Sequence, residues 1–446
     1  MLLRFFVSNF MSFGSEVEFN MFPSALKTHK DHVYTGRKAP LLKAAAIYGA
    51  NGSGKSNFIK AVHFLHDMVV LGDLDKCEVK CQPFRLSESQ ESKPSTFGME
   101  FQIGTKFFEY TISVKDGEIS EESLYETNPV KETAEPVFER KTSLGKTTID
   151  VNPKWVKSRK ERIRYEIYGE DLLPGQSLIF KLKSKLEYAT QVVDWFEKHI
   201  WILYPQTKYF LTFRLCFDKK YKDFLNQLLP ILGTGMEAVD IENIPFSAFF
   251  GKDDEDLRKE FEGKLKDQKN FIQFYKNGKE FIARKENQEY LVNKIKTFNI
   301  GGGGSLVEFE PEEQSDGTRR MLDLIPAIQK MTVDPSVFFI DEIDRSLHPS
   351  MTKTLIAYFM THTTKGQLVF TTHEANLLDF DIFRQDEIWF TEKDNTGATQ
   401  LYSLSDFKPR YDLDIRKGYL AGRFGAIPFL GNLKNLNWEH AQEQGV

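Results

Sequence analysis

Residues 44–62 have the sequence AAAIYGANGSGKSNFIKAV, and this stretch decides the fold. The apolar run 44–48 predicts a buried strand, and the pattern after Ser56 predicts an amphipathic helix. Between them, Gly49 to Ser56 match G-x-x-x-x-G-K-[ST] in full. A strand that passes through a glycine-rich loop into a helix is the context in which this pattern holds phosphate. The stretch therefore predicts an α/β fold built around a nucleotide site.

The loop also predicts which atoms hold the nucleotide. Glycines let backbone N–H groups wrap around phosphate oxygens, and the helix start adds its positive end. Lys55 should reach the β- and γ-phosphates, and Ser56 should ligate Mg²⁺. A glycine-rich turn with a stray lysine is the alternative, which the flanking strand and helix disfavour. The expected nucleotide contacts are Asn51, Gly52, Ser53, Gly54, Lys55, Ser56 and Asn57.

An acidic pair follows a second apolar run in SVFFIDEIDRSLHP, residues 336–349. Ligands of open α/β sheets bind at the carboxyl ends of strands, where Asp341 and Glu342 fall. Asp341 would hold Mg²⁺, and Glu342 would orient or deprotonate the attacking water. Two carboxylates that cap a helix are the alternative. A second carboxylate favours nucleotide hydrolysis over nucleotide storage, because water activation is its natural role.

One of the nine histidines, His373, also ends an apolar run, in QLVFTTHEANLLD at 367–379. A lone histidine is usually structural. This one ends its strand in the register of the acidic pair, where it could bond a γ-phosphate or the attacking water. We therefore expect a catalytic set of Lys55, Glu342 and His373.

The chain's organisation is an α/β fold split by an insertion. Residues 1–175 carry the phosphate loop and an antiparallel β meander, the latter predicted from aromatic runs broken by turns. Residues 176–300 show apolar spacings of three and four, which predict a mainly helical lobe. Residues 301–446 alternate helix and apolar strand, as βαβ units do. No heptad pattern persists, so no long coiled coil is expected.

The composition indicates the cellular compartment but does not identify a binding partner. There are 59 basic and 64 acidic residues, a net charge of −5, which neither demands nor excludes nucleic acid. Only three cysteines occur, which favours a reducing compartment, and Cys77 and Cys81 lack further zinc ligands at the usual spacing. No apolar run reaches the roughly 20 residues that span a bilayer. We expect a cytoplasmic protein with no membrane partner.

The stretch EEQSDGTRR, residues 312–320, has no apolar residue and precedes an apolar helical run. By itself it predicts a polar turn that starts a helix. The order of phosphate loop, this stretch, acidic pair and histidine resembles the ABC-type ATPases of the RecF, SMC and Rad50 branch. The opening FFVSNFMSFGSEVEF, residues 5–19, is similar to that branch's L-x-N-F-x-S-F strand. The separation of Lys55 from Asp341 fits a head split by an insertion.

The resemblance implies a composite site shared by two copies. In such ATPases the signature of one subunit faces the nucleotide of the other, so Ser315 and the N–H of Gly317 would contact the γ-phosphate in trans. It also implies ATP and Mg²⁺ as cofactors and a homodimer of ATP-sandwiched heads, with a higher oligomer of such dimers as the alternative. The Mg²⁺-sensing glutamine would be Gln176, with Gln82 as the alternative. Arg319 and Arg320 would lie near the phosphate, pair with acidic residues of the partner, or be surface residues of the helix. Asp344 would lie at the dimer interface, and Phe6 or Phe13 would lie near adenine or in the core.

The tail from 386 onward, and signatures of the ESxGTRR type, look closer to the stand-alone AAA15 ATPases of bacterial anti-phage defence, a neighbourhood that includes the PARIS and Septu ATPase subunits. This likeness implies an ATP-gated sensor or scaffold that controls a separate nuclease or toxin, with DNA or a phage protein as trigger. The alternatives are a RecF- or SMC-like DNA-binding ATPase in repair or chromosome maintenance, and a scaffold in which turnover is incidental. The basic run 152–166 could bind nucleic acid or be a solvated helix face.

Overall fold

The structure is a computed structural model of the 446-residue chain. It describes residues 1–35, 39–129, 131–143, 145–156, 158–168, 171–207, 211–251, 254–266, 271–276, 279–410 and 413–427. The chain forms two compact units. Unit 1 contains Met1–Lys198 and Val369–Val446, and unit 2 contains His199–Leu368.

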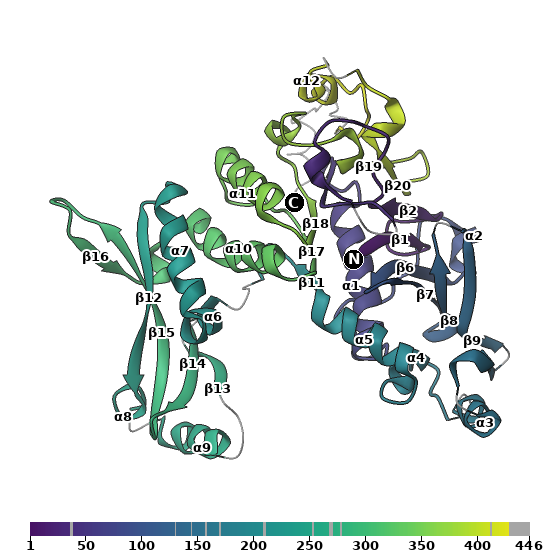
Figure 1. Ribbon diagram of the computed structural model, residues 1–446, viewed down its shortest axis with the longest axis horizontal. Coiled ribbons are helices and arrows are strands. Elements are labelled where there is room, and N and C mark those ends of the chain that lie inside the picture. The colour runs from purple at the N-terminus through teal and green to yellow at the C-terminus, as the bar shows by residue number, and fades with distance from the viewer. Residues whose placement is uncertain are drawn as a thin grey trace, which may run out of the picture. The chain divides into compact units, whose positions relative to one another are not determined.

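An antiparallel sheet forms one layer of unit 1 (Figure 1). Its order is β10-β9-β8-β7-β6-β1-β2. The bounds are β1 Leu2–Ser8, β2 Val17–Asn20, β6 Ser95–Ile103, β7 Lys106–Lys115, β8 Glu118–Asn128, β9 Thr133–Ser143 and β10 Lys146–Val151. The predicted meander is confirmed, and it continues through β9 and β10. The sequence of those two strands is too polar to show an alternating pattern.

The strand of the phosphate loop, β5 (Ala44–Gly49), is buried along its whole length. It pairs in parallel with β19 (Ile388–Lys393), and β20 (Thr399–Ser403) continues antiparallel from β19. Helix α1 (Lys55–Val70) follows the loop and packs Phe58 edge-on against Phe5 and Phe19 of the antiparallel sheet. The predicted α/β fold with an antiparallel β subdomain is confirmed.

Shorter elements complete unit 1. They are the strands β3 (Val33–Tyr34), β4 (Leu41–Leu42) and β18 (Gln367–Thr371), and the helices α2 (Glu88–Glu91), α3 (Arg159–Ile167), α4 (Leu178–Leu182), α5 (Glu187–His199) and α12 (Ile415–Leu420), with β18 and α5 each crossing a unit boundary. Phe13 is fully buried, which supports core packing for this side chain.

Unit 2 contains the parallel strands β11 (Ile200–Leu203) and β17 (Val337–Ile340). Its helices include α6 (Leu211–Phe217), α7 (Lys219–Ile231), α10 (Asp316–Val333) and α11 (Pro349–His362). The longest described helix is α10, at 18 residues, in keeping with the absence of a long coiled coil from the described chain. None of the described helices is long and apolar enough to cross a membrane.

The rest of unit 2 is an antiparallel sheet of order β12-β15-β14-β13, with β16 beside β15. Helices α8 (Phe246–Phe249) and α9 (Glu255–Lys266) lie at one end of it (Figure 1). Phe246, Phe250 and Phe261 pack with Phe281 beneath them. The strand bounds are β12 Met236–Pro245, β13 Phe271–Lys276, β14 Lys279–Glu286, β15 Glu289–Ile300 and β16 Leu306–Phe309.

The prediction of a mainly helical lobe at 176–300 is therefore wrong from Met236 onward. These strands are rich in Lys, Glu and Asn, residues that are depleted in sheets, and this hid the strand pattern. The charges pair across strands instead, as Lys296 does with Glu242 at 3.2 Å and with Glu308 at 2.8 Å. The division into two head halves and a lobe stays a prediction.

A buried acid supports the start of α4. Glu122 of β8 is 1% exposed and accepts hydrogen bonds from the backbone N–H groups of Leu178 at 2.7 Å and Ile179 at 2.8 Å. Arg140, also 1% exposed, lies 3.4 Å from the same carboxylate and donates to the carbonyl of Gln176 at 2.5 Å. Glu122 is thus the counter-charge for a buried guanidinium and the anchor of the first turn of α4.

We expect Glu122→Gln to lower the free energy of unfolding by about 3–5 kcal/mol, because it leaves Arg140 buried without a counter-charge. Urea unfolding followed by circular dichroism measures the change. The neighbouring Glu121 is exposed, so Glu121→Gln is the matched control and should shift stability by less than about 0.5 kcal/mol. Equal shifts in the two variants would contradict this role for Glu122.

Candidate nucleotide-binding site

The phosphate loop joins β5 to α1 through two glycines with left-handed backbone. Gly52 has φ 78° and Gly54 has φ 117°, which residues with a Cβ rarely adopt. Lys55 folds back over the loop, and its Nζ donates to the carbonyls of Gly49 at 2.7 Å and Ala50 at 3.0 Å. Only 5% of Lys55 is exposed. The loop thus fixes an ammonium group beside its own backbone.

The start of α1 is open to an anion. Gly54 is the N-cap, and a glycine has no side chain with which to cap the first-turn N–H groups. The first-turn N–H groups of a helix have no partner within the helix, and an anion is one of the groups that satisfy them. The N-terminal end of α1 is therefore suited to bind phosphate.

Three hydroxyl groups from other segments hold the loop in place. Thr391 Oγ1 of β19 lies 2.6 Å from Ser53 Oγ, and Thr399 Oγ1 of β20 lies 2.7 Å from the carbonyl oxygen of Ser53. Thr399 also bonds Ser12, whose Oγ accepts from the amide of Asn57 at 2.9 Å. A Cβ at Gly49 would lie 2.3 Å from Thr391 Oγ1, so this packing requires glycine.

Ser12, Thr391 and Thr399 were not predicted as loop contacts, because the sequence around them indicates only strands and turns. Asn57 was expected to contact the nucleotide, whereas the described contact of its amide is with Ser12.

His373 follows β18 in unit 1. The backbone N–H of Thr372 donates to the carbonyl of Ile47 at 3.1 Å. The end of strand β18 therefore lies beside β5, close to where the phosphate loop begins. The His373 side chain is exposed. Its role in catalysis stays a prediction, and its place at the same edge as the loop supports it.

The acidic pair lies in unit 2, directly after β17. Asp341 is 4% exposed, and its N–H donates to the carbonyl of Leu203 at 2.8 Å. Glu342 is half-buried and has φ 48°, a left-handed conformation that costs energy in a residue with a side chain. Backbone strain of this kind concentrates at functional sites, which supports the predicted role of Glu342.

The signature stretch begins α10. Ser315 is the exposed N-cap, and its Oγ accepts from the N–H of Thr318 at 3.2 Å, so the predicted helix start is confirmed. A Cβ at Gly317 would lie 2.5 Å from the carbonyl oxygen of Ser346. Glycine is therefore required where the helix start packs on the turn after the acidic pair. Contact of Ser315 and Gly317 with a phosphate stays a prediction.

The two arginines of the stretch differ. Arg319 is exposed and pairs with Asp316. Arg320 is 5% exposed, and its burial lowers its pKa while the charges of Asp341 and Glu342 act in the opposite direction. The surface alternative is wrong for Arg320, which is the buried cation near the acidic pair of the same unit.

Gln176 does not lie near the phosphate loop. Gln176 forms an isolated antiparallel β-bridge with Asp73. The N–H of the next residue, Ser177, donates to the carbonyl of Gly72 at 3.0 Å. Asp73 and Gly72 both lie just past the last turn of α1. The 16 residues of α1 span about 24 Å at the usual rise, so Gln176 cannot ligate a metal ion held by Ser56. The preference for Gln176 is wrong because sequence order gave no information on which end of α1 it meets.

Gln82, the alternative, lies closer to the loop. Its carbonyl accepts from the N–H of Met11 at 2.7 Å, next to Ser12. Its side chain is exposed. Gln82 is thus the better candidate for a metal-sensing glutamine.

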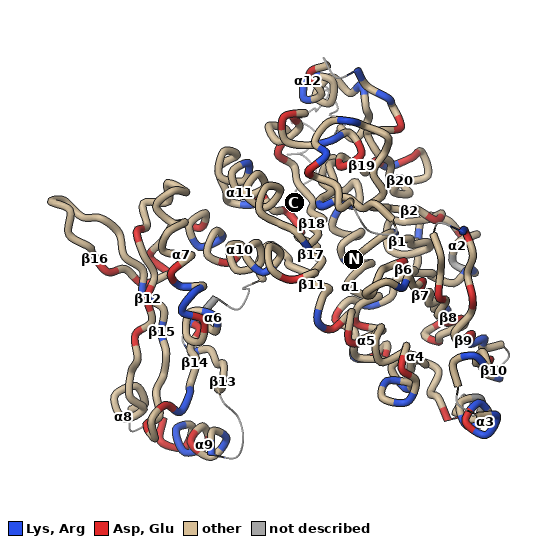
Figure 2. The backbone as a smooth tube through the Cα atoms, viewed as in Figure 1, with Lys and Arg blue, Asp and Glu red and all other residues tan. Residues whose placement is uncertain are grey.

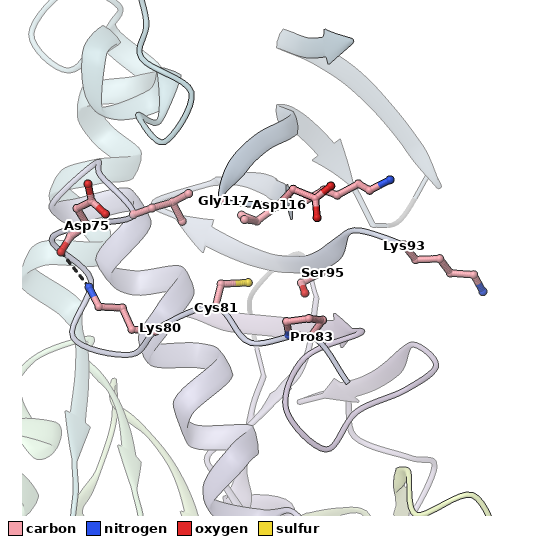
Figure 3. Close-up of a pocket in the computed structure, with 11 residues that line it drawn as sticks. Asp75, Lys80, Cys81, Pro83, Lys93, Ser95, Asp116 and Gly117 are labelled. Carbon is pink, nitrogen blue, oxygen red and sulfur yellow. Dashed lines mark hydrogen bonds between the residues drawn. The ribbon is translucent and has the colours of Figure 1, made fainter. Parts of the chain in front are cut away.

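A separate pocket of about 330 Å³ is lined by the segment that follows α1, by the start of β6 and by the turn between β7 and β8 (Figure 3). Burial raises the pKa of its Cys81 to about 11 and that of nearby Cys77 to about 12, so both remain thiols at neutral pH. The pocket is lined by Leu74, Asp75, Lys80, Cys81, Pro83, Lys93, Ser95, Val114, Lys115, Asp116 and Gly117, none of them a predicted nucleotide contact.

Comparison with known families places the chain among P-loop ATPases. A family profile described as "AAA domain, putative AbiEii toxin, Type IV TA system" matches residues 44–379, from the strand of the phosphate loop to beyond His373. The match covers well over half of the chain, and the chain belongs to this family. The predicted nucleotide-binding class is thereby confirmed at the level of a P-loop ATPase domain.

Solved structures give weaker similarities. The SMC head domain from Thermotoga maritima is 14% identical with a TM-score of 0.37, covering 90% of this chain and 98% of that one. An SmcHead bound to the C-winged helix domain of ScpA is 12% identical with a TM-score of 0.40, covering 92% and 99%. Both superpositions are loose, and nothing further follows from them. No curated protein matches the chain.

Lys55→Ala should weaken ATP binding by at least tenfold, because a hydrogen bond to a charged group contributes about 1.5–3 kcal/mol. Fluorescent-nucleotide titration measures the affinity. Lys60→Ala removes the same charge farther along α1 and should leave affinity unchanged. Unchanged affinity in Lys55→Ala would rule out the phosphate-loop assignment.

Thr399→Val should weaken ATP binding by roughly tenfold, because it removes hydrogen bonds worth about 1 kcal/mol each that hold Ser53 and Ser12. The same titration applies. Thr361→Val, on the exposed face of α11, is the control for the substitution itself. If both variants bind as the wild type does, the loop does not depend on β20.

Proposed function

We propose that this protein binds ATP with Mg²⁺ and hydrolyses it. The observation that carries the proposal is the uncapped start of α1 beside the buried Lys55. Phosphate oxygens would accept from the first-turn N–H groups, and the Lys55 ammonium would exchange loop carbonyls for the β- and γ-phosphates. Ser56 and Asp341 would hold Mg²⁺, with Gln82 as a further candidate ligand.

In the proposed hydrolysis, Glu342 orients the attacking water or takes its proton. The left-handed backbone at this residue supports the role, because it fixes the direction of the carboxylate relative to β17. His373 would bond the γ-phosphate or the same water. Transition-state charge would be balanced by Lys55 and Mg²⁺.

The proposed site is completed by a second copy of the chain. Ser315 lies exposed at the start of α10, and the positive end of an 18-residue helix lies behind it. Gly317 keeps the helix start closely packed on Ser346 and so presents Ser315 outward. ATP would then join two copies, and hydrolysis would release them, which makes the nucleotide a switch between two assembly states. Such dimers would also be the units of a higher oligomer.

The proposed biological role is an ATP-gated sensor or scaffold that controls a separate nuclease or toxin in anti-phage defence, with DNA or a phage protein as trigger. The family's description, which names a putative toxin of a type IV TA system, supports a toxin–antitoxin setting but not a separate effector. The separate effector is supported by the sequence likeness to the AAA15 defence ATPases. A partner effector would respond to the assembly state that ATP sets.

The alternative of a DNA-clamping ATPase gains no support from the basic run 152–166. Lys154 pairs with Glu135 at 2.5 Å, and Arg162 pairs with Asp150 at 2.8 Å. Acidic and basic residues are mixed along α3 and its neighbours (Figure 2). The charges of this segment are therefore partly neutralised locally; Lys157 lies outside the described residues.

Ser315→Arg should leave ATP affinity within about twofold but abolish ATP-driven self-association and cut turnover by at least about tenfold, because the larger side chain blocks the proposed contact in trans. Analytical ultracentrifugation with and without ATP measures the association. Ser158→Arg is the matched control, since Ser158 Oγ also accepts a helix N–H, that of Glu161, at 3.2 Å and is also exposed. Full association in Ser315→Arg would exclude the shared site.

Glu342→Gln should slow ATP turnover by about 10²–10⁴-fold, the usual contribution of a general base. ATP binding should persist, so the ATP-joined dimer should accumulate on size-exclusion chromatography. Glu374→Gln, a partly buried carboxylate next to His373, is the control. Wild-type turnover in Glu342→Gln would remove this carboxylate from the mechanism.

A further inference from the structure

A second set of chemically active side chains lies in unit 1, in the segment between β2 and β4. His29, Asp31 and His32 each offer one ligand atom, and these atoms all lie within 4.8 Å of one another. The two imidazole rings stack, with centroids 4.7 Å apart. Zinc ligands at about 2.0–2.2 Å from the ion lie about 3.4 Å apart in a tetrahedron, so small side-chain rotations would close the set.

Hydrogen bonds fix which nitrogen of each ring is available. His29 Nε2 lies 2.7 Å from the carbonyl oxygen of Phe380, which can only accept, so Nε2 carries the proton and Nδ1 keeps its lone pair. His32 Nδ1 lies 3.1 Å from both carboxylate oxygens of Glu387. With the His32 proton on Nδ1, Nε2 keeps a lone pair that can bind a metal ion. His32 Nε2 lies 3.9 Å from Asp31 Oδ2.

This is the arrangement found around metal-binding histidines, where the ring nitrogen that does not bind the metal donates to a carboxylate or a backbone carbonyl. Such outer partners orient the ring and raise its basicity. The Glu387 carboxylate is fully buried, and it also accepts from the N–H of Arg384 at 2.8 Å. The supporting group is therefore held rigidly.

The backbone that carries the set is also fixed. Arg384 is 1% exposed and donates to the carbonyl of Thr28 at 2.6 Å. Asp386 accepts from both the N–H and the hydroxyl of Ser24 at 2.6 Å. These bonds attach the segment before His29 to the chain that precedes β19, so the histidines are positioned before any ion binds.

We propose that His29 Nδ1, Asp31 and His32 Nε2 bind one divalent metal ion of the zinc class, with water in the remaining position. Imidazole and carboxylate together suit Zn²⁺ and its neighbours rather than Mg²⁺, which prefers oxygen ligands alone. Lys43 lies close enough to interact with two of these carboxylates: burial lowers its pKa, and the charges of Asp31 and Glu387 act in the opposite direction. The ion would fasten the segment that leads into β4 and β5.

The test is titration of the full-length protein with Zn²⁺ alone by isothermal calorimetry, without nucleotide and in excess Mg²⁺, which occupies oxygen-rich sites. We expect about one strong site per chain. His29→Ala and Asp31→Asn should each weaken binding at least tenfold. Both residues can be changed without removing the buried pair of His32 and Glu387, and the Asp31 side chain is 67% exposed, so the variants should fold. Circular dichroism checks that they do.

His362→Ala is the matched control, because this exposed histidine on α11 belongs to unit 2. A second measurement uses Co²⁺, whose visible absorption reports nitrogen ligands in a low-coordinate site and should disappear in His29→Ala. The proposal is overturned if wild type shows no strong site, or if His29→Ala and Asp31→Asn bind Zn²⁺ as tightly as His362→Ala does. These outcomes do not depend on ATP binding or hydrolysis.

Discussion

The contact between the phosphate loop and the hairpin β19–β20 is the constraint on which unit 1 depends. The loop backbone approaches Thr391 and Thr399 so closely that Gly49 and Gly54 have no room for a side chain. In return, two hydroxyl groups replace water around Ser53 and keep the loop in one shape. A binding site for a flexible, highly charged ligand needs such preorganisation, because a loose loop would lose ordering entropy each time it bound.

The chemistry proposed for this protein is divided between two units of the chain. Unit 1 holds the phosphate loop and His373, and unit 2 holds the acidic pair and the exposed start of α10. Both helix starts are positive ends, but they differ in one respect. The N-cap of α1 is Gly54, which has no side chain, whereas the Ser315 side chain already caps α10. A capped helix end can still attract an anion through its dipole, with fewer N–H groups to offer.

Local patterns were enough to predict part of this structure. The glycines, lysine and flanking periodicity of 44–62 specify a strand, a loop and a helix, because each depends on neighbours in sequence. The same holds for β17 with its acidic pair and for the start of α10. The sheet from Met236 to Phe309 was missed, because its stability comes from cross-strand pairs such as Lys296 with Glu242 that no local window contains.

The other differences between the predicted and the observed site come from contacts between residues that are far apart in the sequence. Gln176 was assigned from its order along the chain, and its actual place was decided by contacts of Gly72 and Arg140. Arg319 and Arg320 are adjacent in sequence, yet a helix turns by 100° per residue, so one faces solvent and the other the core. The histidines at 29 and 32 depend on acceptors more than 350 residues away.

That separation also has a consequence for synthesis. Ser53 emerges from the ribosome long before Thr391, which follows it by 338 residues. At about 5–20 residues per second, the loop spends roughly 20–70 s without the hydroxyl groups that hold it. Unit 2 is one uninterrupted segment made during that interval. The nascent chain should therefore gain a firm nucleotide site only after β19 and β20 have been made, which delays any ATP-dependent pairing until unit 2 has also been made.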